Sequence, residues 1–532
     1  MINLKKIFLA IHSLLSSLSE KRFFRYVIFA YLLVVLGNIL NHELWADEIQ
    51  AWLIARDSTS LSNLLYNLRY EGHPPLWHIS LYLISRVTHN MISMQILHLA
   101  ISTISAFLIL KYSLFTRLQK VLIIFGYYFV YEYAAISRNY AFGIMLVLLF
   151  SVLFRPGIGK NYIVLAVILF FLSMTSAYGF LIVIALSGMM FFEFIVDKRL
   201  LKSISDKKFQ LIVSVCIIVL GLWLSAIVMN PAEGSGNSTI LADKIDFSRL
   251  QRVLGNFWNA IIPIPQLGRL SYWNTNIIHD KLFSCILALP LLGFFLLAFS
   301  RNIIIFFLFS FSTFIFLAFQ YFVYPGFLRH SGHYYIILIL CFWLSKYFCK
   351  DYEFERYKNS KLVSFCDKNK ILVLNVILLS DFCVGIFACG MEYFRPFTIS
   401  PKVAEYIVKN NFGNLPILAY PDFRTFSISA YIKNPLYYPQ GDRFGTFLLW
   451  DKERQEDISE NVLIERAKIL SKQKKSEIIL VLTEKLESNY DSITVLREFR
   501  YESIFDDEKY YLYIMKNTNN EIFESSIDIN MN

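Results

Sequence analysis

Two adjacent carboxylates, Asp47 and Glu48, stand in the stretch "NHELWADEIQAWLIARD" at 41–57, directly after the first long apolar run of the chain. A carboxylate held beside a hydroxyl group can take its proton while the oxygen attacks, which accelerates such a reaction roughly 10²–10⁴-fold. A structural role is equally open, since aspartate caps helix N-termini and glutamate is favoured by the positive end of the helix dipole. The pair therefore indicates either a helix start or a general base.

Three further segments carry side chains that could support such a base or bind an anion. They are "RYEGHPPLWHISLYL" with His73, "EYAAISRNYAFG" at 132–143 with Arg138 and Tyr140, and "YPGFLRHSGHYY" at 324–335 with Arg329, His330 and His333. Cationic donors stabilise the charge of a phosphate group. Each residue also has a plain alternative role, either as a membrane-interface anchor or as a turn residue.

The composition places these residues in a membrane protein. The chain has 532 residues, of which 56% are hydrophobic and 17% aromatic, and its mean hydropathy is +0.48. A single soluble core does not need so much apolar surface. The net charge of +10 lies largely in short loops between apolar runs, so it reports membrane orientation rather than nucleic-acid binding. The seven cysteines follow neither a disulfide framework nor a zinc-site spacing.

Eleven apolar runs could cross a bilayer. They are 27–40, 95–110, 121–136, 140–154, 161–176, 178–196, 209–229, 282–300, 303–324, 334–348 and 371–390. The stretch 74–85 is best taken as half-embedded, because every short basic loop then falls on the cytoplasmic side together with the N-terminus. On this topology 41–94, 230–281 and everything after about 391 face outward.

Three parts follow from this topology. Residues 1–26 are expected to form a cytoplasmic amphipathic segment, residues 27–390 an all-α polytopic membrane domain, and residues 391–532 a small extracytoplasmic α/β domain. The tail shows the strand-like pieces "LPILAY", "SEIILVLT" and "YYLYIMK" and the helical pattern "ISENVLIERAKIL". It has no glycine-rich phosphate-binding motif, so no nucleotide site is indicated.

The first outer loop, 41–94, is expected to hold two amphipathic helices on the outer leaflet. Ile49, Trp52 and Leu53 would share one apolar face, and a second face would combine Leu61, Leu64, Leu65 and Leu68. Trp45, Trp52 and Trp77 would then sit at the membrane interface, which suits an apolar ring with one hydrogen-bond donor.

The acidic pair followed by His73–Leu76, "HPPL", resembles the first outer loop of class C glycosyltransferases, in particular the protein O-mannosyltransferases and the lipid A aminoarabinose transferases. The segments 132–143 and 324–335 are similar to an Arg-Pro-Tyr-Ala-Leu type segment and an outer Arg-His-x-Gly segment of such enzymes. Asn139 stands where the proline is usual, and Gln95 where many relatives carry an arginine. The resemblance covers the membrane part and not the tail.

The resemblance implies an enzyme that moves a sugar from a polyprenyl-phosphate donor to a hydroxyl outside the cytoplasm, with inversion. Asp47 would be the general base and Glu48 its support. The donor phosphate would contact Arg138, Tyr140, Arg329 and His330, while His73 and His333 would support the site or contact the acceptor. The acceptor would be a glycan or glycolipid in preference to a protein. No cofactor is required, although a divalent cation could bind paired carboxylates. A bacterial inner membrane is the expected location.

Two other functions remain open. A flippase or other transporter of lipid-linked oligosaccharides would also be polytopic, but it would bury ionisable residues within its spans. The notable charges here stand at span ends and in outer loops, and no inverted repeat is visible. A polysaccharide polymerase is chemically closer, yet it would not need an acidic pair after the first span.

Overall fold

A computed structural model describes residues 17–157, 159–202, 204–230, 246–348 and 360–517. Most of the expected cytoplasmic segment 1–26, part of the expected outer loop 230–281 and the last residues of the tail lie outside this range. Helices dominate the chain, and one six-stranded sheet follows them.

Seven helices in the described part of the chain are long and apolar enough to cross a membrane. They are α2 (Glu20–Asn41), α6 (Ile92–Tyr112), α10 (Ala177–Val196), α12 (Ile204–Met229), α14 (Lys281–Phe299), α15 (Ile303–Phe322) and α18 (Lys361–Phe394). Each contains most or all of one apolar run found in the sequence. The chain is therefore a membrane protein, with seven candidate spans.

The remaining four expected spans contain shorter helices. Their bounds are α7 (Arg117–Ile124), α8 (Tyr140–Leu153), α9 (Tyr162–Ser173) and α17 (His333–Leu344). The stretch 74–85, expected to be half-embedded, forms α5 (Leu76–Ser85), and the other helices of this body are α11 (Lys198–Lys202), α13 (Phe247–Ile261) and α16 (Leu328–Ser331). A helix of 20 residues spans about 30 Å, so these pieces do not reach the length of an upright span. With its 10 residues, α5 is among the shortest.

The run 121–136 was expected to be one span, and this is wrong. The helix α7 stops at Ile124, and the chain continues as the π-helical turn η2 (Tyr128–Glu132) and an irregular buried segment to Asn139. Side chains satisfy its backbone: the Tyr31 hydroxyl donates to the Phe129 carbonyl at 2.7 Å, and the His98 ring contacts two carbonyls. Irregular backbone is stable at membrane depth only where protein groups bind it in this way.

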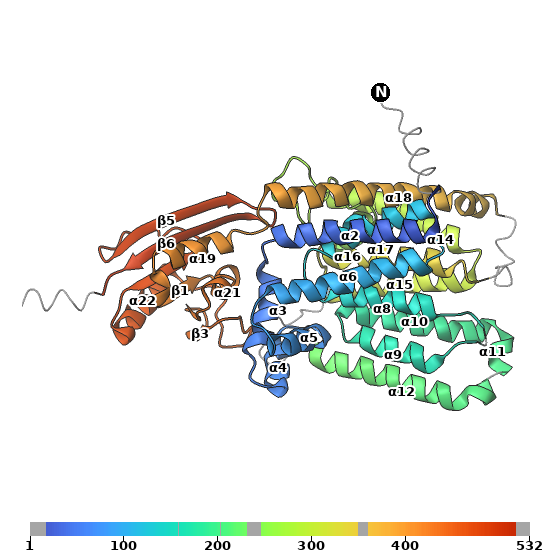
Figure 1. Cartoon of the computed structure of the whole chain (residues 1–532), viewed down its shortest axis with the longest axis horizontal. Helices are drawn as coiled ribbons and strands as arrows, with labels where there is room; N and C mark the ends of the chain where they lie inside the picture. Colours follow the sequence, from blue (N-terminus) through green and yellow to red (C-terminus); the bar gives the residue numbers. More distant parts are fainter. Residues whose placement is uncertain (1–16, 158, 203, 231–245, 349–359, 518–532) are drawn as a thin grey trace, which may run out of the picture.

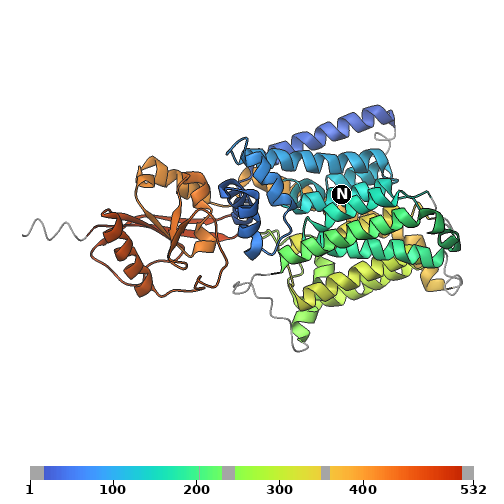
Figure 2. The same ribbon diagram turned by 90° about the horizontal axis from the view of Figure 1, so that it is seen from below.

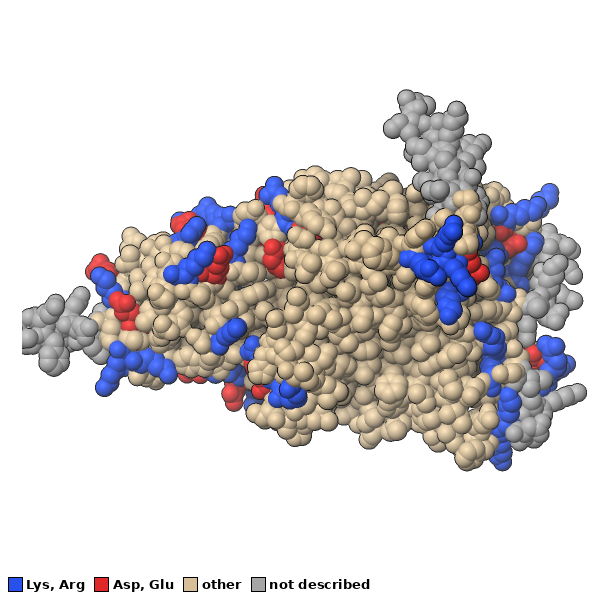
Figure 3. All heavy atoms as spheres, viewed as in Figure 1, with Lys and Arg blue, Asp and Glu red and all other residues tan. Residues whose placement is uncertain are grey.

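The helical body and the sheet lie end to end (Figures 1 and 2). The helices run side by side along the long axis of the molecule, and the chain leaves α18 directly into the sheet region. Figure 3 shows a wide band of the body with almost no charged side chain, and lysines and arginines gathered at its end away from the sheet. The start of α2, the short α11 and the start of α18 lie at that end. This pattern matches the separation of basic loops that the sequence predicts.

The tail forms a mixed sheet with the strand order β3-β2-β1-β4-β6-β5. The strands are β1 (Ile417–Tyr420), β2 (Leu436–Tyr438), β3 (Arg443–Gly445), β4 (Ile478–Leu482), β5 (Ile493–Glu502) and β6 (Asp507–Met515), and the helices are α19 (Ser400–Lys409), η5 (Phe412–Asn414), α20 (Asp422–Thr425), α21 (Ile428–Ile432) and α22 (Glu460–Lys474). The central β1 pairs in parallel with β2 and β4, and the outer pairs are antiparallel. The three strand predictions and the helix prediction for the tail are confirmed. We call Ser400–Met515 the sheet domain.

The first loop is folded between the helical body and the sheet domain. Its main helix, α3 (Ala46–Asp57), shares one hydrophobic core with the sheet domain: Ile49, Trp52 and Leu53 pack in the same cluster as residues of α19, β1 and β4. The expectation that Trp45, Trp52 and Trp77 lie at a lipid interface is wrong, because these residues are 5%, 0% and 2% exposed. Protein, rather than lipid, covers this part of the loop.

The second helix of the loop, α4 (Leu61–Asn67), continues into the short turn η1 (Leu68–Tyr70) and keeps part of its expected amphipathic character. Leu64 and Leu68 are buried, whereas Leu61 and Leu65 are 47% and 42% exposed. The single apolar face predicted for these four leucines is therefore divided between a buried and an exposed half.

Hydrogen bonds join the sheet domain and the segment just before it to the first loop, at a contact that we call the domain seam. Leu448 exchanges two hydrogen bonds of 3.0 Å each with the Gln50 amide. Three further donors act across it: the Phe397 amide to Glu43 at 2.7 Å, the Tyr431 hydroxyl to the Leu44 carbonyl at 3.2 Å, and the Thr446 hydroxyl to Asp57. The seam fixes both ends of α3.

Candidate active site

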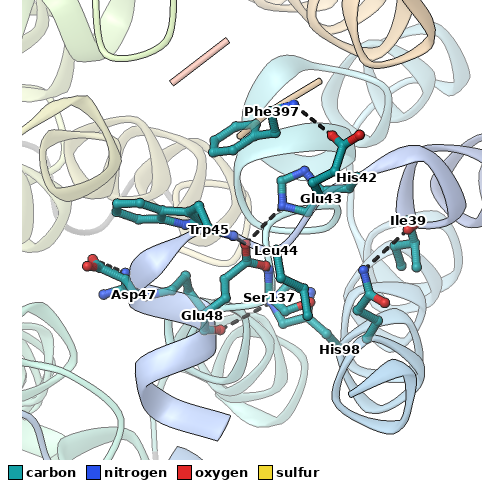
Figure 4. Close-up of polar contacts among 12 residues, drawn as sticks. Ile39, His42, Glu43, Leu44, Trp45, Asp47, Glu48, His98, Ser137 and Phe397 are labelled. Atoms are coloured by element: carbon teal, nitrogen blue, oxygen red, sulfur yellow. Dashed lines mark hydrogen bonds and ion pairs between the residues drawn. The ribbon is translucent and has the colours of Figure 1, made fainter. Parts of the chain in front are cut away.

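Asp47 stands in the first turn of α3 and does not cap it. The cap position belongs to Trp45, and the Glu48 carboxylate accepts the Trp45 amide N–H at 3.1 Å. The helix-capping role that could have explained Asp47 is thus performed by its neighbour. Figure 4 shows the two carboxylates turned in different directions from α3.

Glu48 is fully buried and holds the first loop in place. Its Oε1 atom accepts the Ser137 backbone N–H at 2.5 Å. Its Oε2 atom, which accepts the Trp45 N–H, also contacts the His42 ring at 2.9 Å. The other ring nitrogen of His42 contacts Glu392 at 3.1 Å (Figure 4 shows the His42 and Ser137 contacts). Burial opposes the charged form of His42, but the two carboxylates outweigh it and raise its pKa well above the usual value. Glu48 is therefore a positioning residue, and it fixes the residue immediately before Arg138.

Asp47 lies between two arginines that come from distant parts of the chain. The Arg138 guanidinium donates to its Oδ2 atom, and an Arg329 nitrogen lies 3.5 Å from the same atom. Burial alone would raise the pKa of Asp47, but the two cations outweigh it and hold that pKa below its usual value. The Asp47 side chain keeps 37% exposure, whereas the arginine side chains keep 8% and 10%. The carboxylate is ionised, reachable and flanked by buried positive charge.

Aromatic rings and backbone groups hold both arginines. The Arg138 and Arg329 guanidinium carbons lie 5.7 and 5.2 Å from the centre of the Trp45 ring, so both cations lie against the same indole ring. The His98 ring contacts the Arg138 carbonyl at 3.1 Å, and the Tyr133 hydroxyl donates to the Arg329 carbonyl at 2.7 Å. Both arginines form ion pairs with the same carboxylate, that of Asp47, so two guanidinium groups share one carboxylate.

Two buried N–H donors at this place lack a hydrogen-bond partner among the described residues. They are Nε of Arg329 and Nε1 of Trp45. Buried donors are normally paired, and an unpaired one is destabilising. An anion bound beside the arginines would bring oxygen atoms to such donors. Two guanidinium groups that share one carboxylate, together with these donors, therefore fit a phosphate group.

The histidines expected at the site are neutral partners of this cluster. The Phe327 amide donates to Nδ1 of His330 at 2.9 Å, so the neutral ring carries its proton on Nε2. Burial and then the Arg329 and Arg138 cations hold the His330 pKa well below its usual value. His333 contacts the His330 carbonyl through Nδ1 at 2.8 Å. For His73, burial and then Arg138 lower the pKa to about 4, against a smaller opposing effect of Asp47.

Tyr140 stands beside the same rings, at the start of α8. Its ring lies 5.7 Å from the Arg138 guanidinium and 5.8 and 5.5 Å from the His330 and His333 rings. It is buried within the protein, which excludes a role as an anchor in the lipid interface. The structure thus brings Asp47, the two arginines, the two histidines of 324–335 and Tyr140 to one place, with His73 close enough to sense the charges of Asp47 and Arg138.

No family model, curated protein or solved structure matches this chain. The chemistry of the site therefore has to be argued from its own residues. Within the described ranges no group of three or more histidine, cysteine, aspartate or glutamate side chains could hold a metal ion. The negative charge of Asp47 is balanced by the guanidinium groups of Arg138 and Arg329.

Glu71 lies close to the site, although no pattern in the sequence singles it out. Its carboxylate accepts the Gln50 amide at 2.8 Å, and Gln50 also binds Leu448 across the domain seam. Burial raises the Glu71 pKa to about 7, the Gln50 hydrogen bond opposes that effect, and the negative charge of Asp47 adds to it. A second acidic group therefore stands near Asp47 and holds its proton at neutral pH more readily than Asp47 does.

The raised pKa of Glu71 predicts a pH-dependent stability. In the unfolded chain this side chain loses its proton near the ordinary value of 4.5, but in the folded chain only near about 7. Proton release therefore favours the unfolded state between these two values, and stability falls as the pH rises through them. Glu71→Gln removes this effect while keeping an oxygen that accepts from Gln50. We compare the melting temperature of Glu71→Gln minus that of wild type at two pH values. We expect this difference to be larger at pH 8 than at pH 5. Differential scanning fluorimetry of the purified protein measures it, with the exposed Glu453→Gln variant as a control; an equal offset at both pH values would contradict the prediction.

Proposed function

We propose that this protein is a membrane glycosyltransferase that moves a sugar from a polyprenyl-phosphate donor to a hydroxyl group of an acceptor. The observation that carries the proposal is the reachable Asp47 carboxylate between the buried Arg138 and Arg329 side chains. A base and a phosphate-binding pair of cations are the two elements that such a transfer needs. The resemblance of 41–57, 73–76, 132–143 and 324–335 to class C glycosyltransferases supports the same reaction.

The proposed reaction is one displacement with inversion at the anomeric carbon. The acceptor oxygen forms a bond to that carbon while the bond from carbon to the phosphate oxygen breaks, and the lipid phosphate leaves with the electron pair. Asp47 takes the proton of the acceptor hydroxyl. Arg138 and Arg329 stabilise the charge that grows on the phosphate, and their fixed positions require no reorganisation during the step. The proton on Nε2 of His330 and the Tyr140 hydroxyl are further donors for the phosphate.

The ion pairs also provide an order of events. Without donor, Arg138 and Arg329 hold the pKa of Asp47 down, which makes it a weak base. A phosphate that binds these arginines shares their charge and adds its own negative charge near Asp47, and both changes raise the pKa of that carboxyl. Asp47 becomes a stronger base only when the donor is present. Glu48 keeps Arg138 in place through Ser137, and His73 is a neutral acceptor or donor for the incoming hydroxyl.

The charge distribution gives the proposed orientation. Basic side chains gather at the end of the helical body away from the sheet domain, and the Asp47 site lies at the other end beside it (Figures 1 and 3). Because cytoplasmic loops retain lysine and arginine, the site and the sheet domain face the extracytoplasmic side. A bacterial inner membrane, a lipid-linked donor and a glycan or glycolipid acceptor are parts of the same proposal.

One observation favours transport as the second candidate. Asp381 is fully buried within α18, a candidate span, where its neighbours are the Tyr335 side chain and the backbone of Tyr127 and Tyr128. The statement that charges stand only at span ends is therefore wrong for this residue. An ionisable group inside a span is a frequent mark of an ion or proton pathway. Its position apart from the Asp47 cluster makes the two functions separable.

The two functions predict different results for cells with Asp381→Asn, which removes the charge at nearly constant volume. For a transferase, we expect deletion cells to lack one sugar in their surface glycans and the Asp381→Asn cells to retain it. Mass spectrometry of released glycans measures this, and extraction of lipid-linked sugars identifies the unused donor. A transporter would instead give the same loss in Asp381→Asn and deletion cells, with lipid-linked saccharide accumulating on the cytoplasmic face.

A further inference from the structure

A cavity of about 270 Å³ lies beside the candidate active site and has no part in the proposed chemistry. It is formed by α13, the 262–280 loop, the start of α14 and the segment that leads into α16. Its lining contains the basic side chains Arg252, His279 and Lys281 and five side-chain amides, after which we call it the amide pocket: Asn256, Asn259, Gln266, Asn274 and Asn276.

Two oxygen atoms of the amide pocket are buried without a partner. They are Oδ1 of Asn259 and Oδ1 of Asn274, neither of which meets a donor within the described residues. Buried amide oxygens normally accept a hydrogen bond, and leaving them unpaired is destabilising. Two acceptors of this kind in one cavity call for a ligand that brings hydroxyl or N–H donors.

The backbone holds Asn274 firmly at this place. Its φ angle is +59°, the left-handed region in which asparagine and glycine are the most frequent residues. The flanking turn is closed by hydrogen bonds from the Thr275 amide and hydroxyl to the Tyr272 carbonyl, at 3.0 and 2.5 Å. The backbone N–H of Gln266 donates to the Thr275 hydroxyl oxygen at 3.1 Å. The unpartnered oxygen therefore belongs to a preformed turn rather than to a free loop end.

The amide pocket adjoins the candidate active site. Phe327 lines the pocket, and its ring lies 4.8 Å from the Arg329 guanidinium. Asn274 follows Trp273, whose ring lies 4.9 Å from the Trp45 ring and 5.4 Å from the same guanidinium. Phe327 thus forms a wall between the pocket and the Asp47 cluster, and Trp273 links the cluster to the pocket residue Asn274 through the chain. A ligand longer than the pocket would extend over this wall toward Asp47.

We propose that the amide pocket binds a sugar unit of the acceptor; this rests on the proposed function and assigns the acceptor as a saccharide. The amide oxygens accept from the hydroxyl groups that a sugar supplies, and the cationic side chains of Arg252 and Lys281 stand beside them in the lining. Phe327 is 45% exposed and offers an aromatic face to the C–H side of a sugar ring. Unpaired acceptors beside an exposed aromatic ring fit a polyhydroxylated ligand.

The test is a binding measurement on the purified full chain in lipid nanodiscs, by saturation-transfer difference NMR. The probes are the methyl glycosides of glucose, mannose, galactose, N-acetylglucosamine and glucuronic acid, and a Gly-Ser-Gly peptide as the non-saccharide comparison. The variant Asn259→Ala/Asn274→Gly removes both amides; alanine suits the helix α13, and glycine keeps the left-handed turn. Asn411→Gly is the matched control, because Asn411 has a φ angle of +58° in the sheet domain and is exposed.

We expect at least one glycoside to bind wild type and Asn411→Gly equally and the double variant about tenfold more weakly, as the loss of two hydrogen bonds implies. Asn274→Asp, which keeps the acceptor atoms, should retain binding. Glycoside binding that survives the double variant, binding of the peptide alone, or no glycoside signal from the wild type would each overturn the proposal. Transfer in cells and glycoside binding by the purified chain are separate measurements, so failure of the proposed function and failure of the acceptor site can be told apart.

Discussion

Cells that carry Asp47→Asn are expected to lack the same surface sugar as cells without the protein, while the variant accumulates in the membrane at the wild-type level. The substitution keeps the shape of the side chain and removes the group that takes the acceptor proton. The loss of a general base slows transfer roughly 10²–10⁴-fold. Mass spectrometry of released surface glycans and the rate of sugar transfer in isolated membranes both measure this effect.

A second acidic residue of the same helix is the matched control. Asp57 ends α3 and pairs with Arg56 and the Thr446 hydroxyl, away from the two arginines of the site. Asp57→Asn should keep the sugar. Because Asp47→Asn leaves Arg138 and Arg329 without their carboxylate, its melting temperature has to be measured alongside. Wild-type glycans in Asp47→Asn cells would show that Asp47 is only a counter-ion, and the assignment of the base would then be abandoned.

Arg138→Gln is the second substitution with a large expected effect. It removes a preformed cation from the growing charge of the leaving phosphate, and the loss of one such donor lowers the rate of the chemical step about 10²–10³-fold. It also removes the strongest cause that lowers the pKa of Asp47. The acidic limb of the pH–rate profile should therefore move to higher pH in the variant.

The Arg138→Lys variant distinguishes the effect of the positive charge from that of the planar guanidinium geometry. Lysine restores the positive charge but not the flat fork of donors, so we expect a partial recovery of rate with the acidic limb back near its wild-type position. Arg500→Gln, on the exposed strand β5, serves as the control and should leave rate and profile unchanged. If Arg138→Gln slows transfer without moving the limb, the arginine acts on the phosphate alone and does not tune Asp47.

The sequence was sufficient to select the residues that meet at the site. Asp47 and Arg138 are 91 residues apart and still form an ion pair, and both lie in segments that their side chains and the family resemblance had selected. The strand pieces of the tail were readable because three short apolar runs rich in isoleucine, leucine and tyrosine alternate with a helical pattern. The strand predictions came from local residue patterns, and the site residues were selected by their side-chain types and by the family resemblance.

Contacts that form only in the folded state, between residues far apart in the chain, could not be predicted from the sequence. Glu48 was expected to assist the chemistry, yet its capping contact, Ser137 and His42 use both of its oxygens. The burial of Trp52, the selection of Glu71 and the amide pocket all depend on surfaces contributed by remote segments. The run 121–136 is apolar enough for a span, but its length does not reveal that the chain turns inside the body, where Tyr31 and His98 bind the freed carbonyls.

The domain seam has a consequence for biogenesis. Gln50 and its partner Leu448 are separated by 398 positions, so at roughly 5–20 residues per second the ribosome adds the second about 20–80 s after the first. Throughout that interval α3 has left the ribosome while the surface that buries Ile49 and Trp52 does not yet exist. The first loop therefore lacks the surface that covers it until the last quarter of the chain has been synthesised. A nascent chain arrested after α18 would hold every candidate span in the bilayer and still be inactive.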